Sequence, residues 1–176
     1  MPKLFVAVDL PAEATEALAR IRPPPAAGVR LTEPGQMHLT LHALGEGDVD
    51  HLAPTLQGLK FPGFSVRLQG VGQFSSAGGA VTLWAGVQGS PDLLGLHAAV
   101  AAALAGEGFR PDARPYVPHI TLAQCEPGVA RGVAAGFLTR HAAFLLAEVP
   151  LRSFGLFSIT SSSGAPVCRR ERAFPL

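Results

Sequence analysis

The sequence contains few of the residues that build disulfide frameworks and metal sites. Its 176 residues include only two cysteines, Cys125 and Cys168, and neither lies in a CxxC or similar spacing. Two cysteines cannot form a disulfide framework and cannot alone complete a four-ligand zinc site. We therefore expect two free thiols that are buried or incidental.

Charge is also scarce. Charged residues make up 15% of the chain, and the formal net charge is +1. Such a chain has no global field to attract a long polyanion, so a nucleic-acid substrate would be bound locally, at an end, through few contacts. The densest basic cluster, Arg169, Arg170 and Arg172, is typical of a solvated edge.

Long apolar runs are missing as well. The N-terminal segment is apolar for only a few residues before Asp9 interrupts it, which is too short for the core of a signal peptide and favours a buried strand. Apolar residues still make up 48% of the chain, enough for a sizeable core. We expect a soluble, cytoplasmic, monomeric protein without membrane partners, folded as one two-lobed domain over residues 1–176.

Alternating hydrophobicity, helical periodicity and turn residues predict a mixed α and β chain. Asp9 is expected to cap a first helix that ends near residue 21. The later helices are expected at residues 49–59, 90–104 and 129–139. Strands are expected at residues 4–9, 37–44, 64–74, 80–87, 117–123 and 144–159, and the remainder pairs back after a turn at 161–164.

The two halves of the sequence repeat this order in register. The tetrapeptide His-Leu-Thr-Leu at 38–41 matches His-Ile-Thr-Leu at 119–122, 81 residues later, and 71–75 resembles 154–158. A duplicated unit of strand, helix, strand, helix and hairpin predicts an α+β fold with pseudo-two-fold symmetry. Two mainly antiparallel sheets would be flanked by helices, with the active-site cleft between the two lobes.

Each half therefore carries His-apolar-Thr-apolar on an expected strand. Because side chains alternate along a strand, His38 and Thr40 share one face, and His119 and Thr121 do the same. If the two strands meet at the symmetry axis, two imidazoles and two hydroxyls converge. One neutral imidazole can accept a proton from water while an imidazolium donates one to a leaving oxygen, and hydroxyls can bind phosphate oxygens. The repeated pattern indicates catalysis or phosphate binding.

The two motifs resemble the paired HxTx motifs of the two-histidine phosphoesterase superfamily. More narrowly, the chain resembles the RNA 2',3'-cyclic phosphodiesterases, also called 2'-5' RNA ligases. Segments 4–11, 38–46, 114–119 and 174–176 fit that family too, so the resemblance spans essentially the whole chain.

The resemblance implies hydrolysis of a 2',3'-cyclic phosphate on an RNA end to a 2'-phosphate, with no metal or other cofactor. It also implies a weak, reversible joining of RNA ends through a 2'-5' bond. In these roles His38 would be the proton donor and His119 the proton acceptor. Thr40 and Thr121 would hold the phosphate.

Three positions depart from the family pattern. Ala43 stands where an aromatic side chain often stacks on a base, Gln124 where an arginine commonly follows the second motif, and Cys168 where a tyrosine is usual. These departures bear on base recognition and phosphate affinity, and leave the four motif residues intact.

Other residues are weaker candidates for contacts with substrate. His42 shares the expected strand face of His38 and could line the cleft or form its polar rim. Arg114 could reach a phosphate or support the bend at the following proline, and Tyr116 could stack on a base. Arg30 and Arg152 are further candidates of the same kind as Arg114.

Three alternatives remain open on the sequence. A non-catalytic protein could bind RNA ends with the same fold. The same chemistry could act on a small cyclic nucleotide, such as a cyclic phosphate of ADP-ribose. A metal site built on the two histidines is the third, although further ligands at a recognisable spacing are missing from the motifs.

Overall fold

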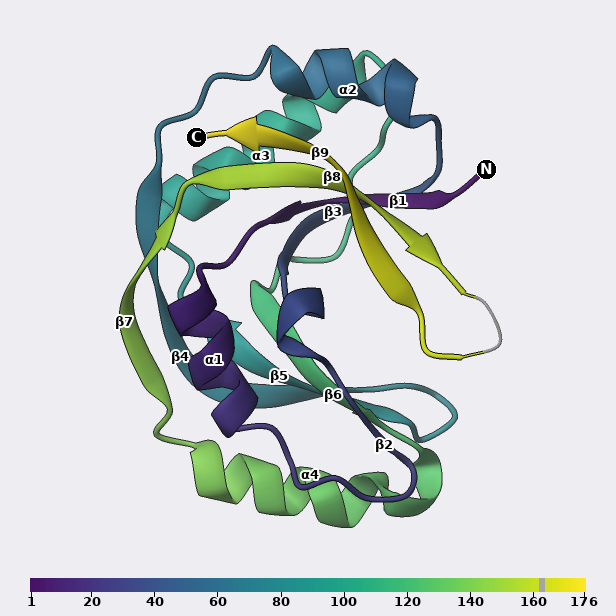
Figure 1. Ribbon diagram of the computed structural model, residues 1–176, viewed down its shortest axis with the longest axis vertical. Coiled ribbons are helices and arrows are strands. Elements are labelled where there is room, and N and C mark those ends of the chain that lie inside the picture. The colour runs from purple at the N-terminus through teal and green to yellow at the C-terminus, as the bar shows by residue number, and fades with distance from the viewer. Residues whose placement is uncertain (162–163) are drawn as a thin grey trace.

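The computed structural model describes residues 1–161 and 164–176, which form two antiparallel sheets with helices packed against them (Figure 1). The four-stranded sheet has the order β3-β1-β8-β9, with β3 at Leu39–Glu46, β1 at Lys3–Val8, β8 at Ser153–Thr160 and β9 at Val167–Pro175. The five-stranded sheet has the order β2-β6-β5-β4-β7, with β2 at Val29–Leu31, β6 at His119–Cys125, β5 at Val81–Val87, β4 at Phe64–Ser75 and β7 at Leu145–Leu151. The α+β class and the two antiparallel sheets predicted from the sequence are confirmed.

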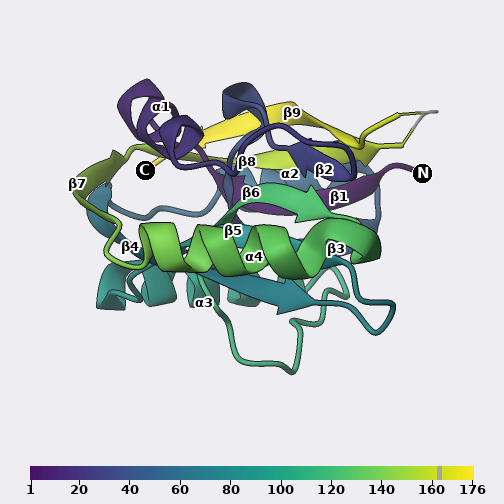
Figure 2. The same ribbon diagram turned by 90° about the horizontal axis from the view of Figure 1, so that it is seen from below.

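Within the described ranges, four α-helices cover these sheets. They are α1 (Ala12–Arg20), α2 (Val49–Gln57), α3 (Pro91–Ala105) and α4 (Pro127–His141), and a short 3-10 helix, η1, spans Pro34–Gln36. The Asp48 carboxylate caps α2 and the Ser90 hydroxyl caps α3, each accepting hydrogen bonds from backbone amides of the first turn. Helix α4 packs on β4, β5 and β6, while α3 contacts β3 and α2 contacts β9 (Figures 1 and 2).

The duplication is visible in the order of the strands. The neighbours β3-β1-β8-β9 correspond to β6-β5-β4-β7, with each motif strand beside the first strand of its own half. The third strand of each set comes from the other half of the sequence: β8 lies beside β1, and β4 lies beside β5. The two halves are therefore interleaved, and one continuous apolar core is built from both sheets.

Two expectations from the sequence are wrong. The segment expected to form one strand over residues 144–159 forms two strands, because the chain leaves the five-stranded sheet after Leu151 and enters the four-stranded sheet at Ser153. Asp9 does not cap α1, whose N-cap position is Pro11. The Asp9 carboxylate instead accepts a hydrogen bond from the Ser153 hydroxyl at 2.9 Å and pairs with Arg170 at 3.2 Å.

The remaining differences are smaller. The three-residue strand β2 was not expected, and the turn expected at 161–164 includes residues 162 and 163, which lie outside the described part of the chain. The basic cluster of Arg169, Arg170 and Arg172 is exposed on β9, the edge strand of its sheet, which agrees with the solvated edge expected from the sequence. Each of its arginines has a carboxylate within 4 Å: Arg169 with Glu171, Arg170 with Asp9, and Arg172 with Asp50. Among the described residues, no helix is both long and apolar enough to cross a membrane.

Candidate active site

The four motif residues line one pocket. His38 directly precedes β3 and His119 is the first residue of β6, so the two motifs begin at the ends of strands that belong to different sheets. A cavity of about 380 Å³ is lined by both histidines together with Thr40 and Thr121. The structure thus brings together the two histidines and two threonines that the repeat singled out.

Both imidazoles are oriented in the same way by the backbone. The Nδ1 atom of His38 lies 2.8 Å from the carbonyl oxygen of Gln36, and the Nδ1 atom of His119 lies 2.7 Å from that of Val117. A carbonyl oxygen only accepts hydrogen bonds, so Nδ1 carries the proton in each neutral ring. Nε2 then keeps the lone pair that can accept a proton, or donates once the ring is protonated.

Aromatic rings pack against each histidine. The His38 ring packs beside the stacked pair of Phe5 and Phe157, with centroid distances of 4.8 and 6.1 Å to the two rings. Burial lowers the pKa of His38, as does the nearby charge of His119, against the opposing effect of its hydrogen bond to Gln36. His38 is consequently held mainly in its neutral form near pH 7 in the free protein.

The second histidine has an equivalent but more open setting. The edge of Phe74 meets the His119 ring at 4.9 Å and Trp84 lies 5.7 Å away. Phe74 and Phe157 hold corresponding places in the two repeats, but Phe74 is 40% exposed and Phe157 is 9% exposed. The pocket is therefore pseudo-symmetric in its two histidines and asymmetric in the solvent exposure of the aromatic rings beside them.

A β-bulge interrupts the first motif strand. Along β3, Thr40 pairs with Ala7 and His42 pairs with the next residue of β1, Val6, so Leu41 is extra. A bulge reverses the alternation of side chains beyond it. His42 is therefore turned into the core, where it is 5% exposed, and it does not line the pocket.

The second motif strand has a bulge at the corresponding place. Thr121 pairs with Trp84 and Ala123 pairs with Leu83, which leaves Leu122 as the extra residue. Leu122 follows Leu41 by 81 residues, the same offset as that between the histidines. The duplication has thus preserved a backbone irregularity as well as the side chains.

Three of the other candidates for substrate contacts do not line the pocket. The hypothesis that His42 lines the cleft is wrong because its Nε2 donates to the carbonyl oxygen of His97 at 2.7 Å. Arg114 is exposed and its guanidinium pairs with Asp112, and neither residue lines the cavity. Tyr116 stacks on His97 at 4.0 Å and its hydroxyl donates to the carbonyl oxygen of Thr40 at 2.8 Å.

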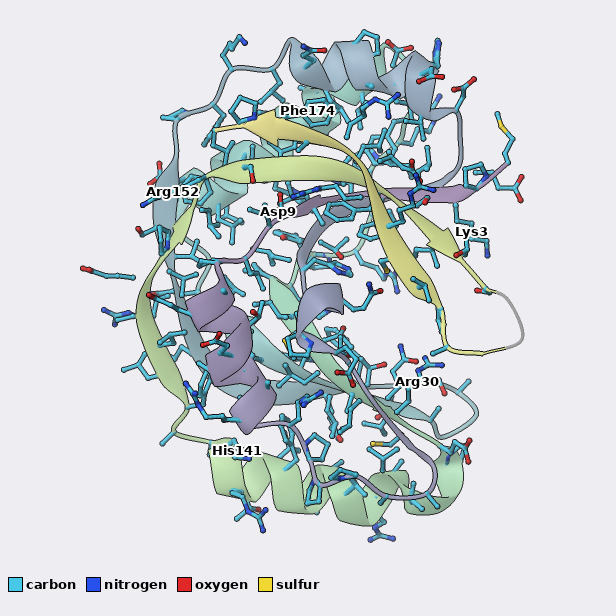
Figure 3. The ribbon with its side chains drawn as sticks, viewed as in Figure 1. Lys3, Asp9, Arg30, His141, Arg152 and Phe174 are labelled. Carbon is cyan, nitrogen blue, oxygen red and sulfur yellow. The ribbon has the colours of Figure 1, made fainter. Side chains whose placement is uncertain are left out.

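Arg30, a weaker candidate on the sequence, does line the pocket. It lies on β2 directly opposite Gln124 of β6, and its guanidinium contacts the Gln124 amide oxygen. Of the described residues that line the pocket, only Arg30 is a lysine or arginine. Figure 3 shows Arg30 on the side of the molecule where the β8–β9 hairpin projects, whereas Arg152 lies at the opposite side.

One wall of the pocket was not predicted from the sequence. It comes from the β8–β9 hairpin, through Ile159, Pro166, Val167 and Cys168. The Gln36 side chain fixes this wall: its Oε1 accepts from the backbone N–H of Cys168 at 2.7 Å, and its Nε2 donates to the same residue's carbonyl at 3.1 Å. Nothing in the sequence pattern marks a contact between residues so far apart.

The described side chains contain no cluster of three or more histidine, cysteine, aspartate or glutamate residues suited to a metal ion. Cys125 is buried and Cys168 is half-buried at the pocket, and burial raises the pKa of both thiols. The donors offered to a ligand are thus imidazole, hydroxyl, amide and guanidinium groups, which suit a phosphate ester.

Comparison with known proteins gave consistent matches. A family model described as the 2'-5' RNA ligase superfamily matches residues 8–158. The chain is similar to an RNA 2',3'-cyclic phosphodiesterase of Archaeoglobus fulgidus, with 28% identity over 98% of this chain and 99% of the relative. It is also similar to an RNA 2',3'-cyclic phosphodiesterase of Escherichia coli, with 35% identity over 68% of this chain and 70% of the relative.

Solved structures agree in fold. A crystal structure of a Thermus thermophilus protein superposes with a TM-score of 0.76 and 28% identity, covering 99% of this chain and 97% of that one. The crystal structure of E. coli LigT complexed with 3'-AMP has a TM-score of 0.73 and 24% identity, covering 99% and 98%. The similarity extends over nearly the full length of both chains.

Proposed function

This chain belongs to the 2'-5' RNA ligase superfamily, and we propose that it is an RNA 2',3'-cyclic phosphodiesterase that opens cyclic phosphates on RNA ends to 2'-phosphates. The observation that carries the proposal is the pair of equivalent imidazoles, each anchored through Nδ1 to a carbonyl oxygen, in one pocket with two threonines. We further propose that the protein acts as a monomer in the cytoplasm.

In the proposed reaction His119 accepts a proton from water through Nε2, and the water oxygen attacks phosphorus. The bond from phosphorus to the 3' oxygen breaks, and that oxygen takes a proton from the His38 imidazolium. The products are a 2'-phosphate and a free 3'-hydroxyl. Thr40 and Thr121 donate hydrogen bonds to the non-bridging oxygens as negative charge develops there. Run in the same direction with the 5'-hydroxyl of another RNA in place of water, the same steps form a 2'-5' bond, and run backwards they cleave that bond and regenerate the cyclic phosphate.

The low pKa of His38 places a condition on its role as proton donor. Burial favours the neutral ring in the free protein, whereas the donor must be protonated. The negative charge of the phosphodiester supplies the missing stabilisation, because an anion beside an imidazolium raises its pKa. Substrate binding therefore favours protonation of His38, which is the form that can donate a proton to the leaving oxygen.

The first test uses protein treated with EDTA and a short RNA ending in a 2',3'-cyclic phosphate. We expect wild type to give the 2'-phosphate, and His38→Ala and His119→Ala each to lower the rate by about 10²- to 10⁴-fold, the contribution of general acid–base catalysis. Binding of the RNA end without turnover would favour a non-catalytic reader. Turnover of small cyclic nucleotides alone would change the substrate class and keep the chemistry.

A sulfur-substituted substrate separates the roles of the two histidines. With sulfur at the bridging 3' position the leaving group is a thiolate, whose conjugate acid has a pKa of about 8.5, so it departs without a general acid. We expect this substrate to restore much of the rate of His38→Ala but not that of His119→Ala. The opposite pattern would exchange the donor and acceptor assignments.

A further inference from the structure

Three aromatic side chains outside the pocket form a continuous stack behind the first motif strand. The His97 ring on α3 lies between His42 of β3 and Tyr116 of the segment before β6, with both centroid distances 4.0 Å and interplanar angles of 27° and 17°. Phe109 closes the far end by meeting the His42 ring edge-on at 5.3 Å. None of these four residues is among those that line the catalytic pocket.

Hydrogen bonds turn this stack into a closed connection between the two motifs. The Tyr116 hydroxyl donates to the carbonyl oxygen of Thr40 at 2.8 Å, and burial raises the pKa of Tyr116, which keeps the hydroxyl proton in place. His42 follows Thr40 on β3 and donates through Nε2 to the His97 carbonyl oxygen at 2.7 Å. The path from Thr40 to His42, His97 and Tyr116 therefore returns to Thr40.

The position of this connection matters because the motif strands belong to different sheets. β3 pairs with β1, whereas β6 pairs with β5 and, along its second half, with β2. No backbone ladder joins β3 to β6 in the described part of the chain, so side chains that bridge the sheets help to set their separation. Tyr116 is such a bridge, since it precedes His119 by three residues and binds the backbone between His38 and His42.

We propose that His42, His97 and Tyr116 form an aromatic clamp that positions the two catalytic histidines relative to each other, with the His97 ring as its spacer. The inference rests on the proposed function, in which His38 and His119 act on opposite sides of one phosphorus atom. A displacement of about 1 Å between reacting groups can cost about 10²-fold in rate. The clamp residues are positioning residues, since their contacts are with the motif strands.

The chain offers variants that separate the parts of the clamp. Tyr116→Phe removes only the hydroxyl that binds Thr40 and keeps the stack. His97→Ala removes the spacer from a half-buried position, and His97→Phe restores a flat ring of similar thickness. His141→Ala is the matched control, because His141 is also a helical histidine packed on an aromatic ring, at 5.4 Å from Phe137 on α4.

The kinetic experiment measures kcat and KM of these variants on the cyclic-phosphate RNA. We expect Tyr116→Phe and His97→Ala to lower kcat between about tenfold and a hundredfold with KM changed by no more than about threefold, because both histidines act together only in the transition state. His97→Phe should recover most of the loss, and His141→Ala should match wild type. Unchanged kcat in Tyr116→Phe and His97→Ala, or a His97→Phe variant as impaired as His97→Ala, would overturn the clamp.

A second measurement needs no turnover and so separates failure of the clamp from failure of the proposed function. The charge of His119 lowers the pKa of His38, so replacing His119 by alanine should raise the pKa of His38 followed by NMR. The size of that rise reports the separation of the two rings. We expect a smaller rise in the His97→Ala background than in wild type or His141→Ala. An equal rise in all three backgrounds would show that the clamp does not set the separation, even if wild type lacks phosphodiesterase activity.

Discussion

Single residues decide how the pocket treats a negatively charged substrate. The imidazoles supply proton transfer in the proposed reaction, but only Arg30 among the described lining residues is a lysine or arginine, which remains charged throughout the neutral range. Its partner across the strand pair is Gln124, a neutral amide, and the one carboxylate among the described lining residues, Glu33, pairs with Arg22 at 3.7 Å. In the described part of the pocket, Arg30 is therefore the fixed cation, on the β2 side, that would meet the phosphate or the rest of the proposed RNA end.

We predict that Arg30→Ala raises KM for the cyclic-phosphate RNA by about tenfold and changes kcat much less, since a charged hydrogen bond contributes about 1.5 kcal/mol to binding. Steady-state kinetics at two salt concentrations checks this, because the loss should shrink as salt screens the charge. Arg114→Ala is the control: its guanidinium already pairs with Asp112 outside the pocket, so its KM should stay near that of wild type. Equal losses in both variants would argue against a specific role for Arg30.

The sequence predicted the four motif residues because two independent patterns agree on them. Strand alternation gives each histidine and threonine a common face, and the internal repeat gives both pairs equivalent places. The same alternation failed for His42, since the bulge at Leu41 lies between it and Thr40 and turns it into the core. Arg30 could only be ranked weakly, because its approach to Gln124 depends on β2, a strand too short to give a periodic pattern.

At the scale of elements, the pocket is enclosed by pieces that meet only in three dimensions. The 3-10 helix η1 leads into His38, and its last residue, Gln36, both accepts from the His38 ring and binds the backbone of Cys168 on β9. One glutamine thus connects the first motif histidine to the wall of the pocket formed by the β8–β9 hairpin. Removing the Gln36 side chain should therefore loosen the hairpin wall beside His38.

We predict that Gln36→Ala accelerates amide hydrogen exchange at Cys168 and lowers the free energy of unfolding by about 1–2 kcal/mol, the net value of two hydrogen bonds. The backbone carbonyl that holds His38 is retained in this variant, so kcat should fall less than in His38→Ala. Gln36→Glu keeps the acceptor for the Cys168 amide and should show slower exchange there than Gln36→Ala. Exchange at Cys168 unchanged from wild type would contradict the connection.

Element positions were largely predictable where caps and periodicity coincide, as at Ser90 before α3. The segment 144–159 was not, because both β7 and β8 are rich in strand-forming residues and only Arg152 separates them. Local propensity describes whether a segment is extended, and it carries no information about which sheet the segment joins. The change of sheet depends on tertiary pairing, because β7 pairs with β4 and β8 pairs with β1.

At the scale of the whole molecule, the interleaved sheets make each half depend on the other. β8 from the second half completes the sheet that holds the first motif, and β4 from the first half completes the sheet that holds the second. Neither half could bury its strands alone, so we propose that residues 1–176 fold as one cooperative domain. The catalytic pocket then exists only in the fully assembled molecule.

The buried histidines make this assembly sensitive to acid. Burial lowers the pKa of His38, His42 and His97 in the folded protein, whereas a histidine in an unfolded chain titrates near 6.5. Below about pH 6.5 the unfolded chain therefore binds more protons than the folded one, and stability must rise with pH in that window. The lowered pKa values of the carboxyl groups of Glu107 and Asp112 act in the same direction, but only at more acidic pH, near and below the ordinary carboxyl range.

We predict that the free energy of unfolding, measured by urea titration, falls between pH 7.5 and pH 5. His97→Phe keeps the stack and removes one of the titrating rings, so its stability should decline less steeply over this range than that of wild type. This comparison isolates the histidine from the carboxyl groups, which stay ionised at pH 5. A stability that is flat or rises on acidification, or an identical slope in His97→Phe, would mean that these rings gain protons as readily in the folded protein as in the unfolded chain.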